Sequence, residues 1–243
     1  MTEAQQTPPI RTAQPTFRAQ PPIRDAATLI LYRKGHSSLE VLMGERGSGH
    51  AFMPNRYVFP GGKLDINDYR IRPAAPLNPV SSSRLERARI TGPRKAVALA
   101  LAAIRETFEE TGLRIAGPAP AKAKPAPRGW RGFCTQDDLA CLAPDPSQLL
   151  YICRAVTPPN RPRRFDARFF AAPAEAAQGS LVASDELGKL HWVTPEAATK
   201  LDLPNITILV LKHLAEWLEH GGDPALPVPY FHNHRGQHIN TPE

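Results

Sequence analysis

Residues 105–113 read RETFEETGL and end a run from Pro93 that predicts a single helix. Proline suits the first position of a helix, and glycine suits the position just past its end. At about 100° per residue, the carboxylates of Glu106, Glu109 and Glu110 share an arc of about 100° within one turn. The apolar residues of the same helix fall on the opposite side: Val97, Leu101, Ile104 and Phe108. We therefore expect one face of this helix in a hydrophobic core and an acidic face opposite.

The acidic face is placed unfavourably for stability alone. Carboxylates near the C-terminal end of a helix oppose its dipole and cost about 0.3–1 kcal/mol each. Glu106 and Glu110 also repel each other at i,i+4, while Arg105 can pair with Glu109 and relieve part of the cost. A solvated acidic patch is one explanation. The other is a hard divalent cation such as Mg²⁺ or Mn²⁺, which prefers clustered oxygen ligands.

The stretch resembles the second half of the Nudix box, G-x5-E-x7-R-E-U-x-E-E-x-G-U with U aliphatic, of the Nudix hydrolase family. The matching positions are Arg105, Glu106, Glu109, Glu110, Gly112 and Leu113. Thr107 departs from the pattern, because that position is usually aliphatic. The first half of the box lies upstream in residues 57–62, YVFPGG.

The two halves of the motif are unusually far apart. The pattern places its Arg 14 residues after its Gly, whereas Gly62 and Arg105 are 43 residues apart, so about 29 residues are inserted. The branch of the family that contains the coenzyme A diphosphatases looks like this, with an FPGG, an Asp-rich turn, a long insertion and an RETFEE-type helix. The segments LDIND at 64–68 and TPP…RFDARFF at 157–170 also resemble that branch.

The resemblance implies an α/β fold, an α/β/α sandwich around a mixed β-sheet. We expect a flexible Pro/Gln-rich tail over 1–25, the Nudix hydrolase domain over 26–220 and a C-terminal tail over 221–243. The insertion occupies about 65–92 and ends in a short helix near 84–90. Residues 117–129 are expected as a loop or linker. Strands are expected near 27–32, 39–43, 57–59 and 149–156, and a further helix is expected over 207–219.

Composition limits the classes of partner and compartment. The chain of 243 residues is 42% apolar, enough for a core, and has no 18-residue apolar run that would cross a membrane. Its net charge of +7 suits an anionic partner, either a phosphate-rich small molecule or nucleic acid. Cys134, Cys141 and Cys153 form no CxxC pair, which fits a reducing cytosol. We expect a cytoplasmic protein, with a homodimer left open.

The resemblance also implies roles for the motif residues. Glu106 and Glu110 would hold Mg²⁺ or Mn²⁺, together with the backbone carbonyl at Gly62. Glu109 would be either a further metal ligand or the general base. Arg105 would orient the glutamates.

The early Glu of the box has no direct counterpart in this sequence. Counting six residues on from Gly62 leads to Asp68, an acid of shorter reach, and counting eight back from Arg105 leads to Val97, which cannot bind metal. Either Asp68 replaces the Glu, or this ligand is missing. Asp185 or Glu186 could supply the late acid that many Nudix enzymes place beside the metal.

The resemblance favours coenzyme A or its acyl esters as substrate, giving 3′,5′-ADP and 4′-phosphopantetheine. Arg46, Arg164 and Arg168 are candidate contacts to phosphate oxygens, although the last two also suit the edge of a strand. ADP-ribose, NAD(H), nucleotide sugars and dinucleoside polyphosphates are alternatives. A hypothesis of another class is a non-catalytic Nudix module that binds RNA or a nucleotide, although nucleic acid is the less favoured partner because Arg105, Glu106, Glu109 and Glu110 are all intact.

Overall fold

The computed structural model describes ten stretches of the chain: 21–35, 38–47, 49, 54–88, 92–120, 125–134, 142–159, 161–223, 225–234 and 237–242. Most of the expected N-terminal tail and Cys141 lie outside these residues. Within the described part, no helix is long and apolar enough to span a membrane.

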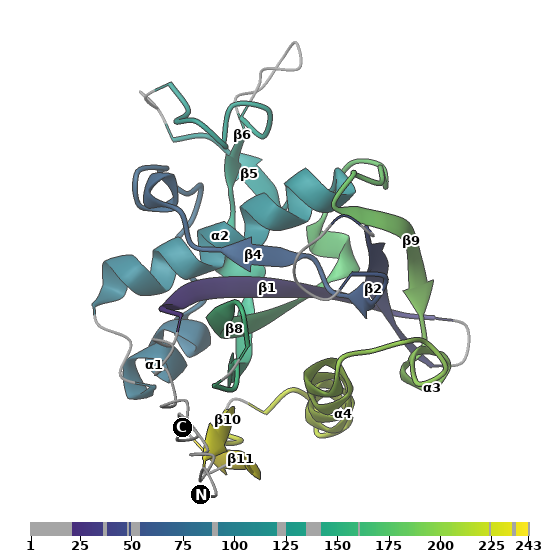
Figure 1. Cartoon of the computed structure of the whole chain (residues 1–243). Coiled ribbons are helices and arrows are strands. Elements are labelled where there is room, and N and C mark those ends of the chain that lie inside the picture. The colour runs from purple at the N-terminus through teal and green to yellow at the C-terminus, as the bar shows by residue number, and fades with distance from the viewer. Residues whose placement is uncertain are drawn as a thin grey trace, which may run out of the picture.

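A mixed sheet forms the centre of the molecule (Figure 1). In the described part of the chain its order is β11-β10-β7-β8-β1-β2-β3, with β4 added beside β1 and β9 beside β2. The strands are β1 (Ile23–Lys34), β2 (Leu39–Arg46), β3 (Tyr57–Val58), β4 (Gly61–Lys63), β7 (Leu150–Val156), β8 (Arg164–Pro173), β9 (Leu187–Val193), β10 (Pro229–His234) and β11 (Gln237–Pro242). The central pair β1 and β8 is parallel, whereas β1 pairs with both β2 and β4 antiparallel. The sheet is therefore mixed, as expected.

Helices cover both faces of the sheet (Figure 1). Alternate residues of β1 point to opposite faces, so Leu29 packs with the core around α2 (Pro93–Thr111), while Ile30 packs with the core around α4 (Asn205–Glu219). A short helix, α3 (Pro195–Ala198), precedes α4 and starts at the N-cap Thr194. The expected α/β/α sandwich is confirmed.

The insertion is folded onto the body. It contains the 3₁₀ turn η1 (Ile66–Tyr69) and the helix α1 (Pro79–Arg87), which begins five residues before the expected start because Asn78 caps it with Pro79 at the first position. Arg84 of α1 is 2% exposed, and its guanidinium donates to the carbonyl of Tyr151 in β7 at 2.8 Å. A buried arginine with such partners anchors the insertion to the sheet.

The expected C-terminal tail over 221–243 contains two strands instead, which corrects this part of the domain prediction. β10 pairs parallel with β7, and β11 pairs antiparallel with β10. Phe231 is buried, and the Arg154 guanidinium lies 4.5 Å from the centre of the Tyr230 ring. The strands form because the edge of β7 is available for pairing. The sequence does not predict them, because a six-residue polar segment carries no pattern that identifies a pairing partner so far away in the chain.

Smaller elements also differ from expectation. β1 begins at Ile23, inside the expected N-terminal tail, because Ile23 pairs with Arg164 of β8. In the region expected as a linker, β5 (Ala116–Pro118) pairs with β6 (Leu142–Pro144). The 3₁₀ turns η2 (Pro146–Gln148) and η3 (Ala174–Ala176) connect further strands.

Candidate active site

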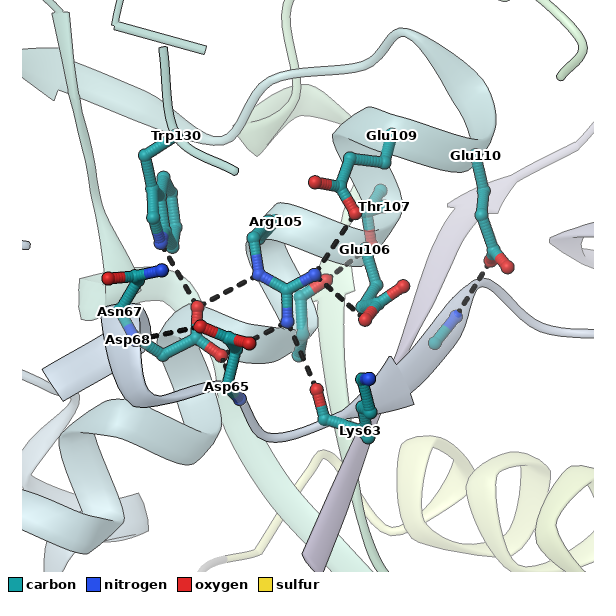
Figure 2. Close-up of polar contacts among 12 residues, drawn as sticks. Lys63, Asp65, Asn67, Asp68, Arg105, Glu106, Thr107, Glu109, Glu110 and Trp130 are labelled. Carbon is teal, nitrogen blue, oxygen red and sulfur yellow. Dashed lines mark hydrogen bonds and ion pairs between the residues drawn. The ribbon is translucent and has the colours of Figure 1, made fainter. Parts of the chain in front are cut away.

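The last turn of α2 lies against the glycine pair of β4. The backbone N–H of Gly61 donates to Oε2 of Glu110 at 2.9 Å (Figure 2). A Cβ on Gly62 would lie inside the carboxyl group of Glu106, and a Cβ on Gly61 would meet the backbone of Ala27 at 2.7 Å. Gly61 suits this position because β1 lies directly against it, and Gly62 suits its position because a side chain there would displace the Glu106 carboxyl group.

Arg105 is at the centre of the site and is buried, with 6% of its surface exposed. Its Nη1 donates to Glu106 Oε1 at 2.8 Å and to Glu109 Oε2 at 3.0 Å. Its Nη2 donates to the carbonyl of Lys63 at 3.0 Å. The guanidinium thus connects two glutamates of α2 to the end of β4, an arrangement compatible with the orienting role that the resemblance implies.

Asp68 fixes the other side of Arg105. Arg105 Nε donates to Asp68 Oδ1 at 2.9 Å, and Nη2 donates to Oδ2 at 3.0 Å. Oδ1 also accepts from the indole N–H of Trp130 at 3.0 Å, and Oδ2 accepts from the backbone N–H of Asp65 at 2.8 Å (Figure 2). The sequence left two alternatives: either Asp68 replaces the early Glu as a metal ligand, or that ligand is missing. The geometry favours a third role, in which Asp68 anchors Arg105 and both of its carboxylate oxygens are engaged.

The three glutamates share a desolvated environment. Burial raises the pKa of Glu106 and Glu109, and Arg105 offsets part of that rise. Burial raises the pKa of Glu110 to about 8, although the Gly61 hydrogen bond opposes the rise. Glu186 lies close enough to raise the pKa of all three glutamates further.

The residues present fit a divalent cation. Oε1 of Glu110 is buried and accepts no hydrogen bond from the described residues, and Arg46 Nη2 lies 3.6 Å away. Arg105 uses only one oxygen each of Glu106 and Glu109. Within the described stretches, no three His, Cys, Asp or Glu side chains already surround one point, and Arg105 pairs with both Glu106 and Glu109. A cation would join a cluster that an arginine now holds together.

Most of the residues predicted from sequence are brought together here. The site collects Gly62, Arg46, Asp68, Arg105, Glu106, Glu109 and Glu110 from four separate stretches of chain. Glu186 is exposed and acts on the cluster through its charge. Asp185 is exposed, and the structure shows no contact between it and these residues.

Arg168 and Arg164 lie elsewhere. Arg168 is 3% exposed and forms ion pairs with Asp25 at 2.7 Å and Asp166 at 3.1 Å. Asp25 also binds Lys95, near the start of α2, eleven residues and roughly 16 Å along the helix from Glu106. Arg164, at the start of β8, donates to the carbonyl of Thr157 at 3.2 Å. Both arginines are part of the sheet rather than of the acidic cluster.

Two contributors to the site were not expected from the sequence. The Lys63 carbonyl and the Trp130 indole both hold the Asp68–Arg105 pair, and Trp130 directly follows a segment expected to be a linker. Sequence patterns give no sign of either, because neither contact has a characteristic spacing. The unusual Thr107 is explained, since its hydroxyl donates to the carbonyl of Ala103 at 2.8 Å and so can be buried in the helix.

A glutamate-rich helix end that faces a Gly-Gly strand in an α/β/α sandwich is the arrangement that the resemblance to the Nudix hydrolases leads us to expect. The chain is 27% identical to a Nudix hydrolase of known structure from Alicyclobacillus acidocaldarius, with a TM-score of 0.60 over 80% of this chain and 92% of that one. It is 29% identical to the acyl-coenzyme A diphosphatase NUDT19 of Gallus gallus over 68% of this chain. It is 25% identical to a Caenorhabditis elegans protein named nudix hydrolase 7 over 79% of this chain.

These similarities confirm the resemblance to Nudix hydrolases and to their coenzyme A diphosphatase branch. The chain spans 61% of the length of the worm protein and 56% of the length of the chicken protein. No protein-family profile matches the chain.

Proposed function

We propose that this protein hydrolyses a diphosphate bond in a nucleotide-containing compound and that it needs Mg²⁺ or Mn²⁺. The observation that carries the proposal is that Glu110 and Glu106 meet Gly61 and Gly62, with Glu109 beside them on Arg105, in spite of the long insertion. Without a cation this arrangement partly desolvates Glu106 and Glu109 beside Arg105 and buries Glu110 with one oxygen that accepts no hydrogen bond from the described residues, which costs stability. Such a cost is explained if the cluster serves to bind a positive charge.

Glu106, Glu110 and the backbone carbonyl of Gly62 are the groups we assign to the cation. When bound, the cation would stabilise negative charge on phosphate oxygens and lower the pKa of a water molecule. The buried, hydrogen-bond-free oxygen of Glu110 supports its place in this set.

Glu109 is the residue we assign as general base. Its side chain is 41% exposed, more than those of Glu106 and Arg105, so it can reach a water molecule at the surface of the site. Its raised pKa improves its capacity to accept a proton. Arg105 holds Oε2 of Glu109, which orients the other oxygen for that transfer.

Coenzyme A or an acyl-coenzyme A is the substrate we propose, with 3′,5′-ADP and 4′-phosphopantetheine as products. The similarity to acyl-coenzyme A diphosphatases supports this choice. Arg46 is the best-placed cation for a substrate phosphate, because it already lies beside Glu110 at the acidic cluster. ADP-ribose, NAD(H), nucleotide sugars and dinucleoside polyphosphates are the competing substrates.

Turnover of a panel of these compounds with Mg²⁺ or Mn²⁺ tests the proposal. Glu109→Gln and Glu110→Gln should each lower kcat by at least about 100-fold, since each removes a charged group that acts on the reacting atoms. Glu196→Gln, an exposed change on α3, is the matched control and should leave turnover unchanged.

The outcomes separate the hypotheses. Hydrolysis of coenzyme A that the two substitutions abolish would support both reaction and substrate. Hydrolysis of another member of the panel alone would retain the reaction and reject the substrate. No turnover at all, together with salt-dependent binding of RNA, would favour a non-catalytic binding module instead.

A further inference from the structure

Trp130 is a buried side chain outside the Nudix motif that is connected to the acidic cluster through a hydrogen bond to Asp68. It is fully buried and lies in a turn between β5 and β6, well beyond the end of α2. Its ring packs edge-on against Phe133 at 5.3 Å between centroids. An indole offers a single N–H and no acceptor, so a buried tryptophan needs an acceptor in one direction. Here that acceptor is Oδ1 of Asp68.

The bond from Trp130 continues into the site through charged hydrogen bonds. Asp68 receives both Nε and Nη2 of Arg105, so its carboxylate plane and the guanidinium plane are fixed relative to each other. The remaining nitrogen, Nη1, holds Glu106 and Glu109. Figure 2 shows the resulting chain of contacts, in which Trp130 lies at one end and the two glutamates at the other.

The turn that carries Trp130 also shields this pair from water. Its backbone is closed by hydrogen bonds from Trp130 N to the Pro127 carbonyl and from Cys134 N to the Trp130 carbonyl, each 3.0 Å. Gly129 has a φ of +87°, and a Cβ there would be 3.6 Å from Cδ of Arg105. The turn thus lies beside the aliphatic part of the Arg105 side chain. Excluding water lowers the local dielectric constant and strengthens the bonds between Asp68 and Arg105.

We propose that Trp130 is a positioning residue for the acidic cluster. By fixing the Asp68 carboxylate it sets the orientation of Arg105, and through Arg105 it sets where Glu106 and Glu109 present their free oxygens. The turn that carries Trp130 thereby becomes part of the site. This inference rests on the proposed function, because the oriented groups are the ones assigned to the cation and to the base.

Trp130→Phe tests the proposal, because phenylalanine keeps an aromatic ring and lacks the N–H. Trp217→Phe is the matched control: Trp217 is 2% exposed and donates its N–H to the carbonyl of Asp223 at 3.2 Å, remote from the cluster. Both variants lose one buried indole hydrogen bond and similar volume. Mn²⁺ affinity, measured by electron paramagnetic resonance of the free ion, should fall about tenfold in Trp130→Phe only.

The kinetic readout separates positioning from general damage. In Trp130→Phe we expect kcat to fall about tenfold while the KM for the substrate changes less than about twofold, because the cluster rather than the substrate site is displaced. Asp68→Asn should have a larger effect of the same kind. Adding Trp130→Phe to Asp68→Asn should then cost little more, since both act through the same carboxylate.

Two results would overturn the positioning role, and a third would separate that role from the proposed reaction. Equal Mn²⁺ affinities for Trp130→Phe and Trp217→Phe would overturn the positioning role, even in an active enzyme. Fully additive effects of Trp130→Phe and Asp68→Asn would overturn the route through Asp68. A wild-type protein that binds Mn²⁺ but hydrolyses nothing would reject the proposed reaction, and a loss of Mn²⁺ affinity in Trp130→Phe would then still support the positioning role.

Discussion

Glu110 illustrates how burial, as the largest of several influences, changes the chemistry of a carboxyl group. It is 2% exposed, and burial raises its pKa from an ordinary 4.5 to about 8. One oxygen accepts the Gly61 N–H, while the other accepts no hydrogen bond from the described residues. In the metal-free protein such a group is protonated over much of the neutral range, and a cation would have to displace that proton.

The stability of the metal-free protein should therefore fall as pH rises from about 4.5 to about 8. In this window the folded state binds the Glu110 proton and the unfolded state releases it, so the free energy of unfolding decreases with pH. The upper limit of the loss is on the order of 5 kcal/mol, at about 1.4 kcal/mol per pKa unit. Urea unfolding of wild type and Glu110→Gln at pH 5 and pH 8 measures it. The same pH slope in both proteins would contradict the assignment.

Gly62 allows a second test at the residue scale. In Gly62→Ala the new Cβ would overlap with the Glu106 carboxyl group, so this side chain would have to leave its position beside Arg105. We expect at least about a 100-fold loss of kcat together with weaker Mn²⁺ binding, because small displacements of reacting groups cost this much. In Gly49→Ala the new Cβ meets nothing within 4 Å, so this variant serves as the control. Equal activity of the two variants would contradict the close approach.

At the scale of elements, the insertion is attached to the sheet through α1. Nη1 of Arg84 donates to the carbonyl of Tyr151, and Nη2 donates to those of Asp223 and Leu226 at 3.2 and 3.3 Å. α1 thus joins β7 to the turn before β10. These contacts of α1 do not include residues of the acidic cluster, so we expect α1 to stabilise the fold without taking part in the chemistry, whereas η1 of the same insertion supplies Asp68 to the site.

Arg84→Met should lower the free energy of unfolding by about 3 kcal/mol, because it leaves buried carbonyls without their charged donor. The kcat of the folded fraction should stay unchanged. Arg87→Met, an exposed change on the same helix, should alter stability by less than about 0.5 kcal/mol. Thermal and urea unfolding, with kinetics at low temperature, check both expectations. A large loss of kcat in Arg84→Met would instead connect α1 to the reaction.

At the scale of the whole molecule, the sheet extends from β3 to the C-terminal strands. β10 covers the edge of β7, and the N-terminal strand β1 lies at the centre of the sheet with β8 and β2 on either side. The N-terminal strand β1 and the C-terminal strands therefore have different structural roles. The C-terminal region closes an edge of the sheet, while the start of β1 is held between neighbours.

Deletion of residues 229–243 should expose the edge of β7 and the surface that buries Phe231. We expect the melting temperature to fall by about 5–10 °C and the protein to associate as its concentration rises, since unpaired edges add further strands. Light scattering and thermal unfolding measure both effects. Deletion of residues 1–20, expected from the sequence to be a tail, is the control and should change neither. An unchanged melting temperature without 229–243 would show that these strands contribute little.

The spacing of residues in the sequence was sufficient to predict the central elements and most of the site. The acidic face of α2, its glycine stop and the FPGG strand depend on periodicity and on backbone freedom, which are properties of neighbouring residues. The short strands and α4 were also predicted from patterns among neighbouring residues. The sandwich fold followed from the resemblance of these motifs, and the structure confirms it.

Only the tertiary structure decided which distant groups meet. It brings Trp130 and Lys63 to the Asp68–Arg105 pair, places Arg168 in a buried ion pair with Asp25, and turns an expected tail into β10 and β11. The physical reason is the same in each case. A buried donor, charge or strand edge is satisfied by whichever partner the packed fold places within about 3 Å, and no local pattern in the sequence encodes that partner.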